Sequence, residues 1–240
     1  IPPTWRSWEE TPIEVRLQRL SSAAEHLAQE RSALDEAIAS GKAASLQHAT
    51  GSSGRVLETV SRLLAAASEV AELQSTVAIP GQDNFTTWSN PRGLGVVAVD
   101  EGSDPAGLAA LVFAPLLAGN GVLVAAPHGL EQVARLLAES LWREGVPRNV
   151  LCLAPSGASV ERLAAGPVHF AAVDLSLERT RSIYKALAAT DEGTRPRWLK
   201  ALISLSDGPS PGEVGFLRQF AHPKTVAVRT VRHGADLKLV

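Results

Sequence analysis

Between residues 94 and 206, short apolar segments rich in β-branched residues alternate with segments of helical periodicity. The apolar segments lack the alternation of a strand with one solvated face, so each is expected to be a strand buried on both faces. Strands of this kind that alternate with helices form a parallel sheet with right-handed crossovers. The expected strands are 94–100, 122–126, 149–155, 168–175 and 198–206, and the expected helices are 105–118, 130–143, 160–165 and 178–188. The fold class is therefore α/β, with a doubly wound, parallel Rossmann-like sheet.

One segment of this region, residues 105–127, contains no charged side chain and is long enough to span a bilayer. Pro115 and the Ala118–Gly121 turn divide it into a helix-length piece and a strand-length piece, and basic or aromatic flanks are missing. A buried α/β core is the better interpretation. The net charge of −2 gives no electrostatic reason to expect a nucleic acid or an anionic membrane as a partner.

The sequence before residue 80 is expected to be helical. Apolar residues recur at helical spacing from Ile13 to Gly41, and again from Val56 to Val70 after a break at Thr50–Gly54. We expect three parts: N-terminal helices in residues 1–79, the Rossmann-like sheet in 80–207, and a linker with a C-terminal strand in 208–240.

The C-terminal part differs in pattern from the sheet. Gly208–Gly215 is rich in proline and glycine and is expected to be a turn or linker, whereas the segment from Lys224 to Val240 alternates apolar and polar residues. A strand with a polar face is expected to protrude and to pair outside the finished sheet. It would either cross back over the domain or add to the edge of a partner's sheet.

The single cysteine, Cys152, excludes an internal disulfide and a cysteine-rich metal site and fits a reducing compartment, so we expect a cytoplasmic protein. The opening "IPPTWRSWEETP" has acids and prolines where a signal peptide has an apolar core. The chain contains no methionine, even at position 1, and is expected to be a fragment of a longer protein.

Residues able to carry chemistry are few. The six histidines have no metal-ligand spacing, so no metal site is expected. Cys152 lies in the middle of an expected strand, where a buried thiol is inert. Ser204 and Ser206 lie at a strand end, but no nucleophile-elbow motif surrounds them.

The sequence contains neither the glycine-rich dinucleotide-binding motif nor the glycine-rich P-loop motif. A phosphate could still meet the backbone amides at the start of the helices near Leu130 or Glu178. Neither junction offers a lysine, and at the second one Asp174 and Glu178 would repel an anion.

Several stretches nevertheless follow one another in a recognisable order. They are "WEETPIEVRLQRLSSAAEHLAQERSALDEAIASGKA", "PRGLGVVAVDEGSDPAGLAALVFAPLLAGNGVLVAAP", "GVPRNVLCLAPSG", "VHFAAVDLS", "RWLKALISLSDGPSP" and "FLRQFAHPKTVAV". The series resembles the aldehyde dehydrogenase superfamily over essentially the whole chain: N-terminal helices, first βαβ unit, later strands and C-terminal oligomerisation strand. The resemblance implies that the parent protein is an aldehyde dehydrogenase, an NAD(P)-dependent oxidoreductase.

The positions at which this family carries its functional residues are altered. The family's Pro-Trp-Asn turn, whose asparagine belongs to the oxyanion hole, aligns with Asp100–Ser103. The lysine that binds the cofactor ribose aligns with Ala126, which precedes Pro127. Of the family's Phe-Thr-Gly-Ser motif only the serine, Ser176, is retained.

The catalytic residues have no counterpart either. The general-base glutamate aligns with Leu205 or Ser206, and neither can take a proton from water at neutral pH. The domain with the catalytic cysteine is absent, and the surroundings of Cys152 do not match it. We therefore expect no catalytic residue and no cofactor. NAD is possible only if the degenerate crevice around the vestigial positions Ala126, Pro127 and Ser176 still binds it.

The combination is most like the truncated, non-catalytic C-terminal domain of a family 16 aldehyde dehydrogenase. The resulting hypothesis is a pseudoenzyme domain with a structural, assembly role. It would dock on a catalytic aldehyde dehydrogenase domain of the same or a second chain through Lys224–Leu239. Two alternatives stay open: a nucleotide-binding module with a degenerate NAD site, and the C-terminal aldehyde-dehydrogenase-like domain of a bifunctional proline-utilisation enzyme.

Overall fold

The computed structural model describes residues 6–41, 52–72, 75–79, 82–189 and 200–229. Its centre is a five-stranded sheet in the order β5-β4-β3-β6-β7, in which all neighbouring strands are parallel. The strands are β3 (Leu94–Val99), β4 (Gly121–Ala125), β5 (Leu151–Leu153), β6 (Phe170–Asp174) and β7 (Ala201–Ser204). Four of them lie within a segment expected to be a strand, and β4 begins one residue before its expected segment 122–126. The predicted α/β class with a parallel, Rossmann-like sheet is confirmed.

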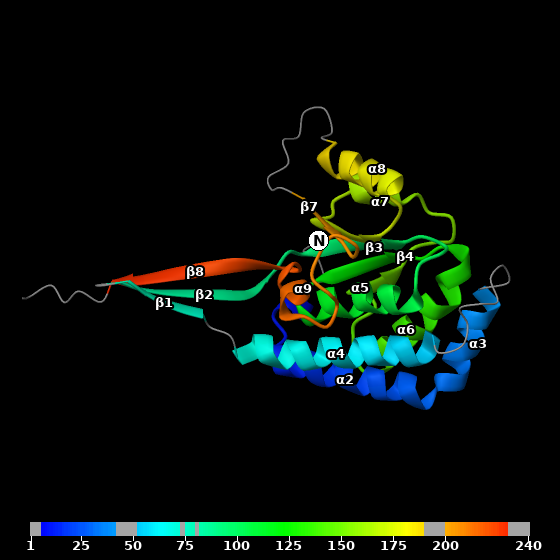
Figure 1. The fold of residues 1–240 in the computed structure, drawn as a ribbon, viewed down its shortest axis with the longest axis horizontal. Helices are drawn as coiled ribbons and strands as arrows, with labels where there is room; N and C mark the ends of the chain where they lie inside the picture. Colours follow the sequence, from blue (N-terminus) through cyan, green and yellow to red (C-terminus); the bar gives the residue numbers. More distant parts are fainter. Residues whose placement is uncertain (1–5, 42–51, 73–74, 80–81, 190–199, 230–240) are drawn as a thin grey trace, which may run out of the picture.

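Both faces of the sheet are buried, as its apolar strands require. Val97 and Val99 of β3 belong to the core cluster on one face, whereas Val96 and Ala98 belong to the cluster on the other. Helices α5 (Pro105–Leu117) and α6 (Glu131–Arg143) cover the first face, and α7 (Val160–Ala165) and α8 (Leu177–Ala188) the second (Figure 1). The sheet is therefore doubly wound.

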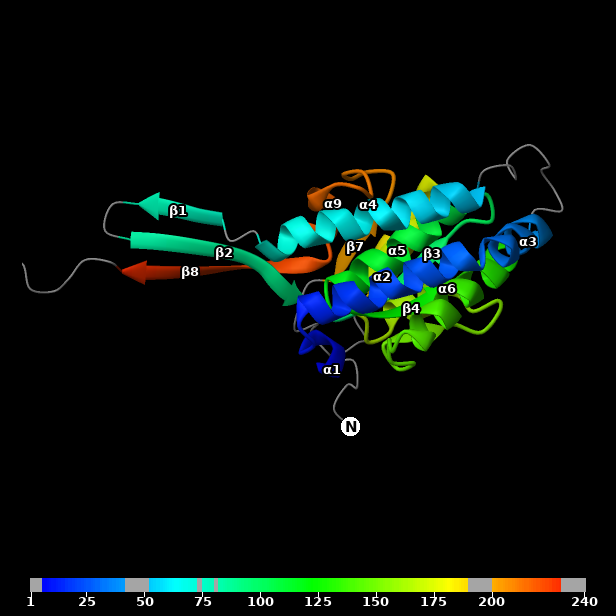
Figure 2. The ribbon, with the colours of Figure 1, turned by 90° about the horizontal axis from the view of Figure 1, so that it is seen from below.

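The N-terminal helices add a layer outside α5. They are α1 (Arg6–Glu9), α2 (Ile13–Gln29), α3 (Arg31–Gly41) and α4 (Ser52–Glu72). Helix α4 packs on α5, and α2 packs on α4 and α6 (Figure 2). Every residue of α5 is buried, so the uncharged segment is an internal helix followed by a strand. Within the described residues, no helix has the length and apolar character needed to cross a membrane.

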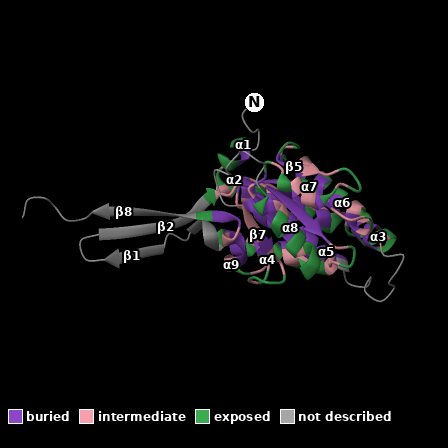
Figure 3. Cartoon of the chain, turned by 90° about the horizontal axis from the view of Figure 1, so that it is seen from above, coloured by how far each residue is buried: buried purple, intermediate pink, exposed green. Residues whose placement is uncertain are grey.

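A second, smaller sheet projects from this body (Figure 1), in which buried residues lie along the strands of the main sheet (Figure 3). It consists of β1 (Ser75–Ile79), β2 (Gln82–Pro91) and β8 (Ala221–Arg229), antiparallel in the order β1-β2-β8. The C-terminal strand therefore lies outside the main sheet, as predicted, and it pairs with β2 of its own chain. The sequence did not predict β1 and β2, and residues 230–240 of the expected strand lie outside the described residues.

Two short helical segments complete the described chain. The 3-10 turn η1 (His128–Leu130) leads into α6, and α9 (Val214–Arg218) precedes β8. Helix α9 starts inside Gly208–Gly215, which was expected to be only turn or linker. Its Phe216 side chain is fully buried, and the Phe216 ring meets the Phe220 ring edge-on at 5.4 Å between centroids. Packing of apolar residues at the base of the small sheet therefore outweighs the local preference for a turn.

Asn120 connects the main sheet, helix α5 and the small sheet. Its fully buried side chain accepts a hydrogen bond from the Gly93 amide at 2.9 Å, just before β3. Its Nδ2 donates to the Pro115 carbonyl at 3.0 Å and to the Phe220 carbonyl at 2.9 Å, just before β8. All three are direct hydrogen bonds, so this one amide ties the start of β8 to the body.

We expect Asn120→Ala to lower the free energy of unfolding by about 3 kcal/mol, because it leaves one amide and two carbonyls of the buried backbone without this partner. Urea unfolding followed by circular dichroism measures the change. Asn90→Ala, which removes an exposed amide, should change the value by less than about 0.5 kcal/mol. A loss below about 1 kcal/mol for Asn120→Ala would contradict the connecting role.

Candidate functional site

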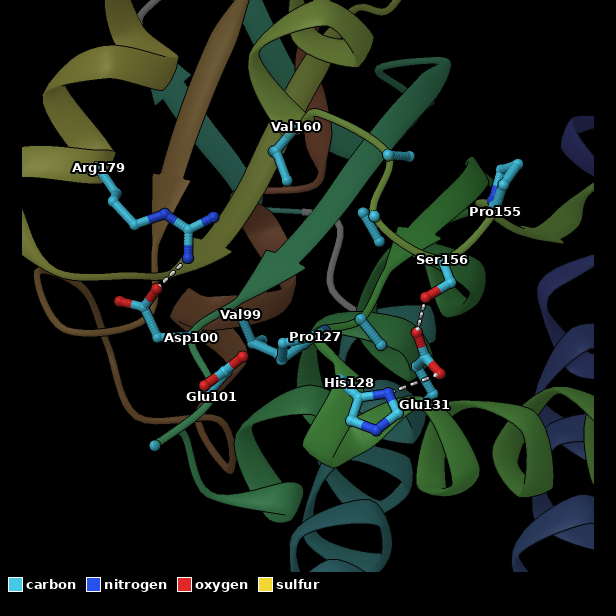
Figure 4. Close-up of a pocket in the computed structure, with 15 residues that line it drawn as sticks. Val99, Asp100, Glu101, Pro127, His128, Glu131, Pro155, Ser156, Val160 and Arg179 are labelled. Atoms are coloured by element: carbon cyan, nitrogen blue, oxygen red, sulfur yellow. Dashed lines mark hydrogen bonds and ion pairs between the residues drawn. The ribbon is translucent and has the colours of Figure 1, made fainter.

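A cleft of about 760 Å³ opens at the carboxyl ends of β3, β4 and β5. In doubly wound folds this edge of the sheet is where ligands bind. The cleft is lined by the segments that follow the three strands, 99–102, 125–128 and 155–158, with Glu131, Val160 and Arg179 from the helices (Figure 4). It is the candidate functional site.

The exit of β4 contributes little to hydrogen bonding in the cleft. Ala126 presents only a methyl group, and Pro127 has neither a polar side chain nor a backbone N–H. Pro127 precedes η1 and makes no side-chain capping bond there. The first two of the three positions expected from the sequence to be vestigial therefore line the cleft without a side-chain donor that could hold a sugar hydroxyl.

Ser176, the third position, lies at the N-terminus of α8. Its side chain makes no capping hydrogen bond, but its backbone amide donates to Asp100 Oδ2 at 2.5 Å. Asp100 Oδ1 accepts from Arg179 in the first turn of the same helix (Figure 4). The carboxylate that follows β3 is thus bound to the start of the helix that follows β6.

The rest of the cleft is predominantly acidic. Glu101 is exposed beside Asp100, and Glu131 at the start of α6 accepts from the Ser156 hydroxyl at 2.6 Å. His128 Nδ1 lies 3.6 Å from Glu131 Oε2. Among the described residues that line the cleft, three are carboxylates, none is a lysine, and Arg179 is the one permanently charged cation. An anion entering the cleft would face like charges.

The cysteine and the serines that the sequence singled out are not activated as nucleophiles. Cys152, which is half-buried in β5, donates from Sγ to the Arg148 carbonyl at 3.0 Å, and burial raises the pKa of its thiol. Leu205 packs against the core, while the Ser204 and Ser206 hydroxyls bond to each other at 2.8 Å. None of these groups is placed beside a general base.

Metal binding is equally unsupported among the described residues, where no three His, Cys, Asp or Glu side chains gather. His169 accepts from the Leu94 amide at 3.0 Å, and burial lowers its pKa. Burial and the nearby Arg92 lower the pKa of His222. These two histidines lie near the base of the small sheet, far from the cleft lining.

Sequence reasoning identified the altered segment Asp100–Ser103 but missed the partners of Asp100. Arg179 and Ser176 follow β6, whereas Asp100 follows β3. Only the order of the strands makes these two exits neighbours, because β3 and β6 pair directly. The sequence signal for this contact would have been an acidic residue directly after one strand, Asp100, together with an arginine in the first turn of the helix after another strand, Arg179.

Comparison with known proteins gives a consistent result. Residues 4–194 match the profile described as the aldehyde dehydrogenase family. A search of curated proteins gives no match. The fold is similar to a mutant of Bradyrhizobium japonicum proline utilization A (PutA), with 25% identity, a TM-score of 0.71 and 83% of this chain covered.

Two structures of 1-pyrroline-5-carboxylate dehydrogenase are also similar. A mutant of the Thermus thermophilus enzyme has a TM-score of 0.71, and the Thermus enzyme with bound NAD has one of 0.69; both are 21% identical and cover 83% of this chain. The chain spans 39% of each dehydrogenase chain and 20% of the PutA chain.

The raised pKa of Cys152 predicts slow alkylation. Since burial favours the neutral thiol, the thiolate fraction at pH 7 is smaller than for free cysteine, and the rate should rise as pH approaches the raised pKa. Iodoacetamide labelling followed by mass spectrometry measures this at the only cysteine. We expect labelling several-fold slower than for glutathione at pH 7. An equal or higher rate would show an activated thiol.

Proposed function

Since the chain belongs to the aldehyde dehydrogenase family, we propose that it is a non-catalytic domain of a larger NAD(P)-dependent aldehyde dehydrogenase, with a role in assembly. The observation that carries the proposal is a small sheet with open edges that projects from the body. We further propose that the chain has three parts: the N-terminal helices in 1–79, the Rossmann-like sheet in 80–207, and the linker with the C-terminal strand in 208–240. We also propose a cytoplasmic location.

The cleft does not fit the cofactor that one structural neighbour binds. A dinucleotide needs its pyrophosphate near a helix N-terminus and a partner for its ribose hydroxyls. Here Asp100 is bound to the Ser176 amide, and Ala126 has no polar side chain. The negative charges of Glu101 and Glu131 would also repel the pyrophosphate of a dinucleotide. This supports a domain that works without NAD.

The small sheet supports the assembly role. Its order β1-β2-β8 leaves one edge of β8 unpaired within the described residues, and backbone groups along an open edge can accept a further strand. We propose that a catalytic aldehyde dehydrogenase domain, of the same or a second chain, docks through Lys224–Leu239. The part of this segment up to Arg229 lies in β8.

Two parent proteins fit this role. We prefer the second domain of a family 16 aldehyde dehydrogenase, in which an active dehydrogenase domain precedes a truncated one. The alternative is the C-terminal domain of a bifunctional proline-utilisation enzyme, which the similarity to PutA favours. The upstream sequence separates them, because a bifunctional parent would carry a second catalytic domain there.

Disruption of β8 should weaken assembly. Ala227 pairs with Asn84 of β2, and Ala227→Pro removes an N–H and breaks the regular strand. We expect association with the parent's catalytic domain to weaken roughly tenfold or more, measured by analytical ultracentrifugation.

Ala227→Ser retains the N–H and serves as the control, with association unchanged. Deletion of Lys224–Val240 should weaken association at least as much as Ala227→Pro does. If the deletion leaves both sedimentation and the parent's dehydrogenase activity unchanged, the assembly role is wrong.

The alternative of a nucleotide-binding module rests on the backbone amides near Leu130 and Ser176, at the start of α6 and α8. Isothermal titration with NAD and then NADP decides between the two functions. We expect no binding heat at millimolar concentrations, since a carboxylate is bound to one amide and Glu131 lies at the other helix start. Saturable binding with a dissociation constant below about 1 mM, worth about 4 kcal/mol, would favour the module.

A further inference from the structure

A joint segment, Arg92–Leu94, leads from β2 of the small sheet into β3 of the main sheet (Figure 1). The guanidinium of its first residue donates from Nε to the Gln219 carbonyl, and the amide of its second residue donates to Asn120 Oδ1 at 2.9 Å. The amide of its third residue donates to Nδ1 of His169 at 3.0 Å. Of these three acceptors, only the imidazole nitrogen can take up a proton near neutral pH.

His169 binds Leu94 through both its backbone and its ring. Its backbone amide donates to the Leu94 carbonyl at 2.7 Å, while its Nδ1 accepts from the Leu94 amide. The ring also lies against the backbone of Gly93, where φ is +119° and an added Cβ would lie 2.7 Å from Nδ1. A side chain at position 93 would displace the imidazole, so the glycine allows the ring to lie against the joint segment.

The hydrogen bond from the Leu94 amide requires a neutral ring. A neutral imidazole keeps a lone pair on one nitrogen, here Nδ1, whereas an imidazolium carries N–H on both nitrogens. Protonation of His169 would therefore set the Nδ1 N–H against the Leu94 N–H, and the amide would lose its acceptor. Loss of this acceptor weakens the hold of the body on the start of β3.

The surroundings of His169 disfavour the imidazolium. Burial lowers the pKa of its ring, and the nearby Lys200 lowers it further. Lys200 is itself held in place, because Nζ donates to the Gly166 carbonyl at 2.9 Å. Burial, Arg92 and His169 likewise lower the pKa of His222 in β8. Lys200 and Arg92 are cations and His222 can become one, so a proton on His169 would meet like charges from β2, β7 and β8.

The lowered pKa of His169 sets the direction of the pH dependence. In the unfolded or locally opened chain the ring titrates near its ordinary pKa of about 6.5, whereas in the closed fold the pKa is lower. Well above about pH 6.5 the ring is neutral in both forms, and the bond to Leu94 is fully present. As the pH falls towards the lower pKa, the open form takes up the proton first, so the stability that the bond contributes is lost.

We propose that His169 is a pH-sensitive switch on the joint segment: the neutral ring holds Leu94, and protonation of the ring releases it. The small sheet is then attached to the body by one hydrogen bond fewer at acidic pH. In its consequence for association the inference rests on the proposed assembly role, because the released sheet contains β8. The switch itself is a property of the single chain.

Two variants separate His169 from the general effect of removing a histidine. His169→Asn places an amide oxygen near the position of Nδ1, so it keeps an acceptor for the Leu94 amide but takes up no proton. His26→Asn is the matched control, because it makes the same substitution on α2, where the ring lies 3.5 Å from Glu30 Oε1. Only the first variant should remove the pH dependence at Leu94.

Hydrogen exchange of the 240-residue chain, followed by NMR at pH 7.5 and pH 5.0 and corrected for the intrinsic rates, tests the proposal. In the unmodified chain and in His26→Asn, the protection of the Leu94 amide should fall about fivefold or more at the lower pH. In His169→Asn it should change by less than about twofold. The Val122 amide, which donates to the Val150 carbonyl at 2.7 Å, should change by less than about twofold in all three chains.

An equal loss of protection at Val122 would indicate global unfolding, and an equal loss at Leu94 in His169→Asn would indicate another titrating group. Either result overturns the proposal, as does constant protection of Leu94 in the unmodified chain. The readout is local exchange in a single chain, so its failure is distinguishable from failure of the assembly role, which is measured by sedimentation.

A titration of the unmodified chain covers the case in which His169→Asn does not fold. The ring signals of His169, followed by NMR, should titrate with a midpoint below about pH 6.5 that coincides with the loss of protection at Leu94. A midpoint at or above that value, or one separated from the loss at Leu94 by about a pH unit, would overturn the proposal.

Discussion

The complete burial of α5 is the constraint on which the rest of the structure depends. A helix with no polar face must be covered on every side, and all of its residues from Pro105 to Leu117 are buried. The sheet covers one side, and α4 and α2 cover the other. The N-terminal helices are therefore a necessary layer of the body. The same burial places β3 and β4, which flank α5 in sequence, in the interior of the sheet, so their exits form the cleft.

The cleft illustrates how one scaffold can retain the geometry of a binding site while its chemistry changes. Its position at the carboxyl ends of the strands follows from the parallel topology. Its electrostatics follow from individual side chains, and here Asp100, Glu101 and Glu131 make it acidic. Fold similarity to an NAD-bound dehydrogenase therefore concerns the scaffold and does not by itself assign NAD to this cleft. Arg179, which would attract an anion, is already paired.

Local patterns in the sequence predicted the main sheet closely. The expected helix 105–118 is observed as Pro105–Leu117, and the expected strand 94–100 as Leu94–Val99. Strands β1 and β2 were missed, because their partners are each other and β8, which follows far along the chain. Helix α9 was missed because glycine and proline around it favour a turn, whereas burial of Phe216 stabilises the helix in the folded chain.

The sequence by itself determined the α/β class, the buried helix and the chemistry absent at Ala126 and Pro127, because periodicity and side-chain type are properties of a short segment. Only the tertiary structure decided that Asp100 meets Ser176 and Arg179, and that the terminal strand pairs with β2. Both contacts join residues distant in sequence, and their distance in space depends on the strand order. The order of the strands therefore decides which hydrogen-bond donors the Asp100 carboxylate meets.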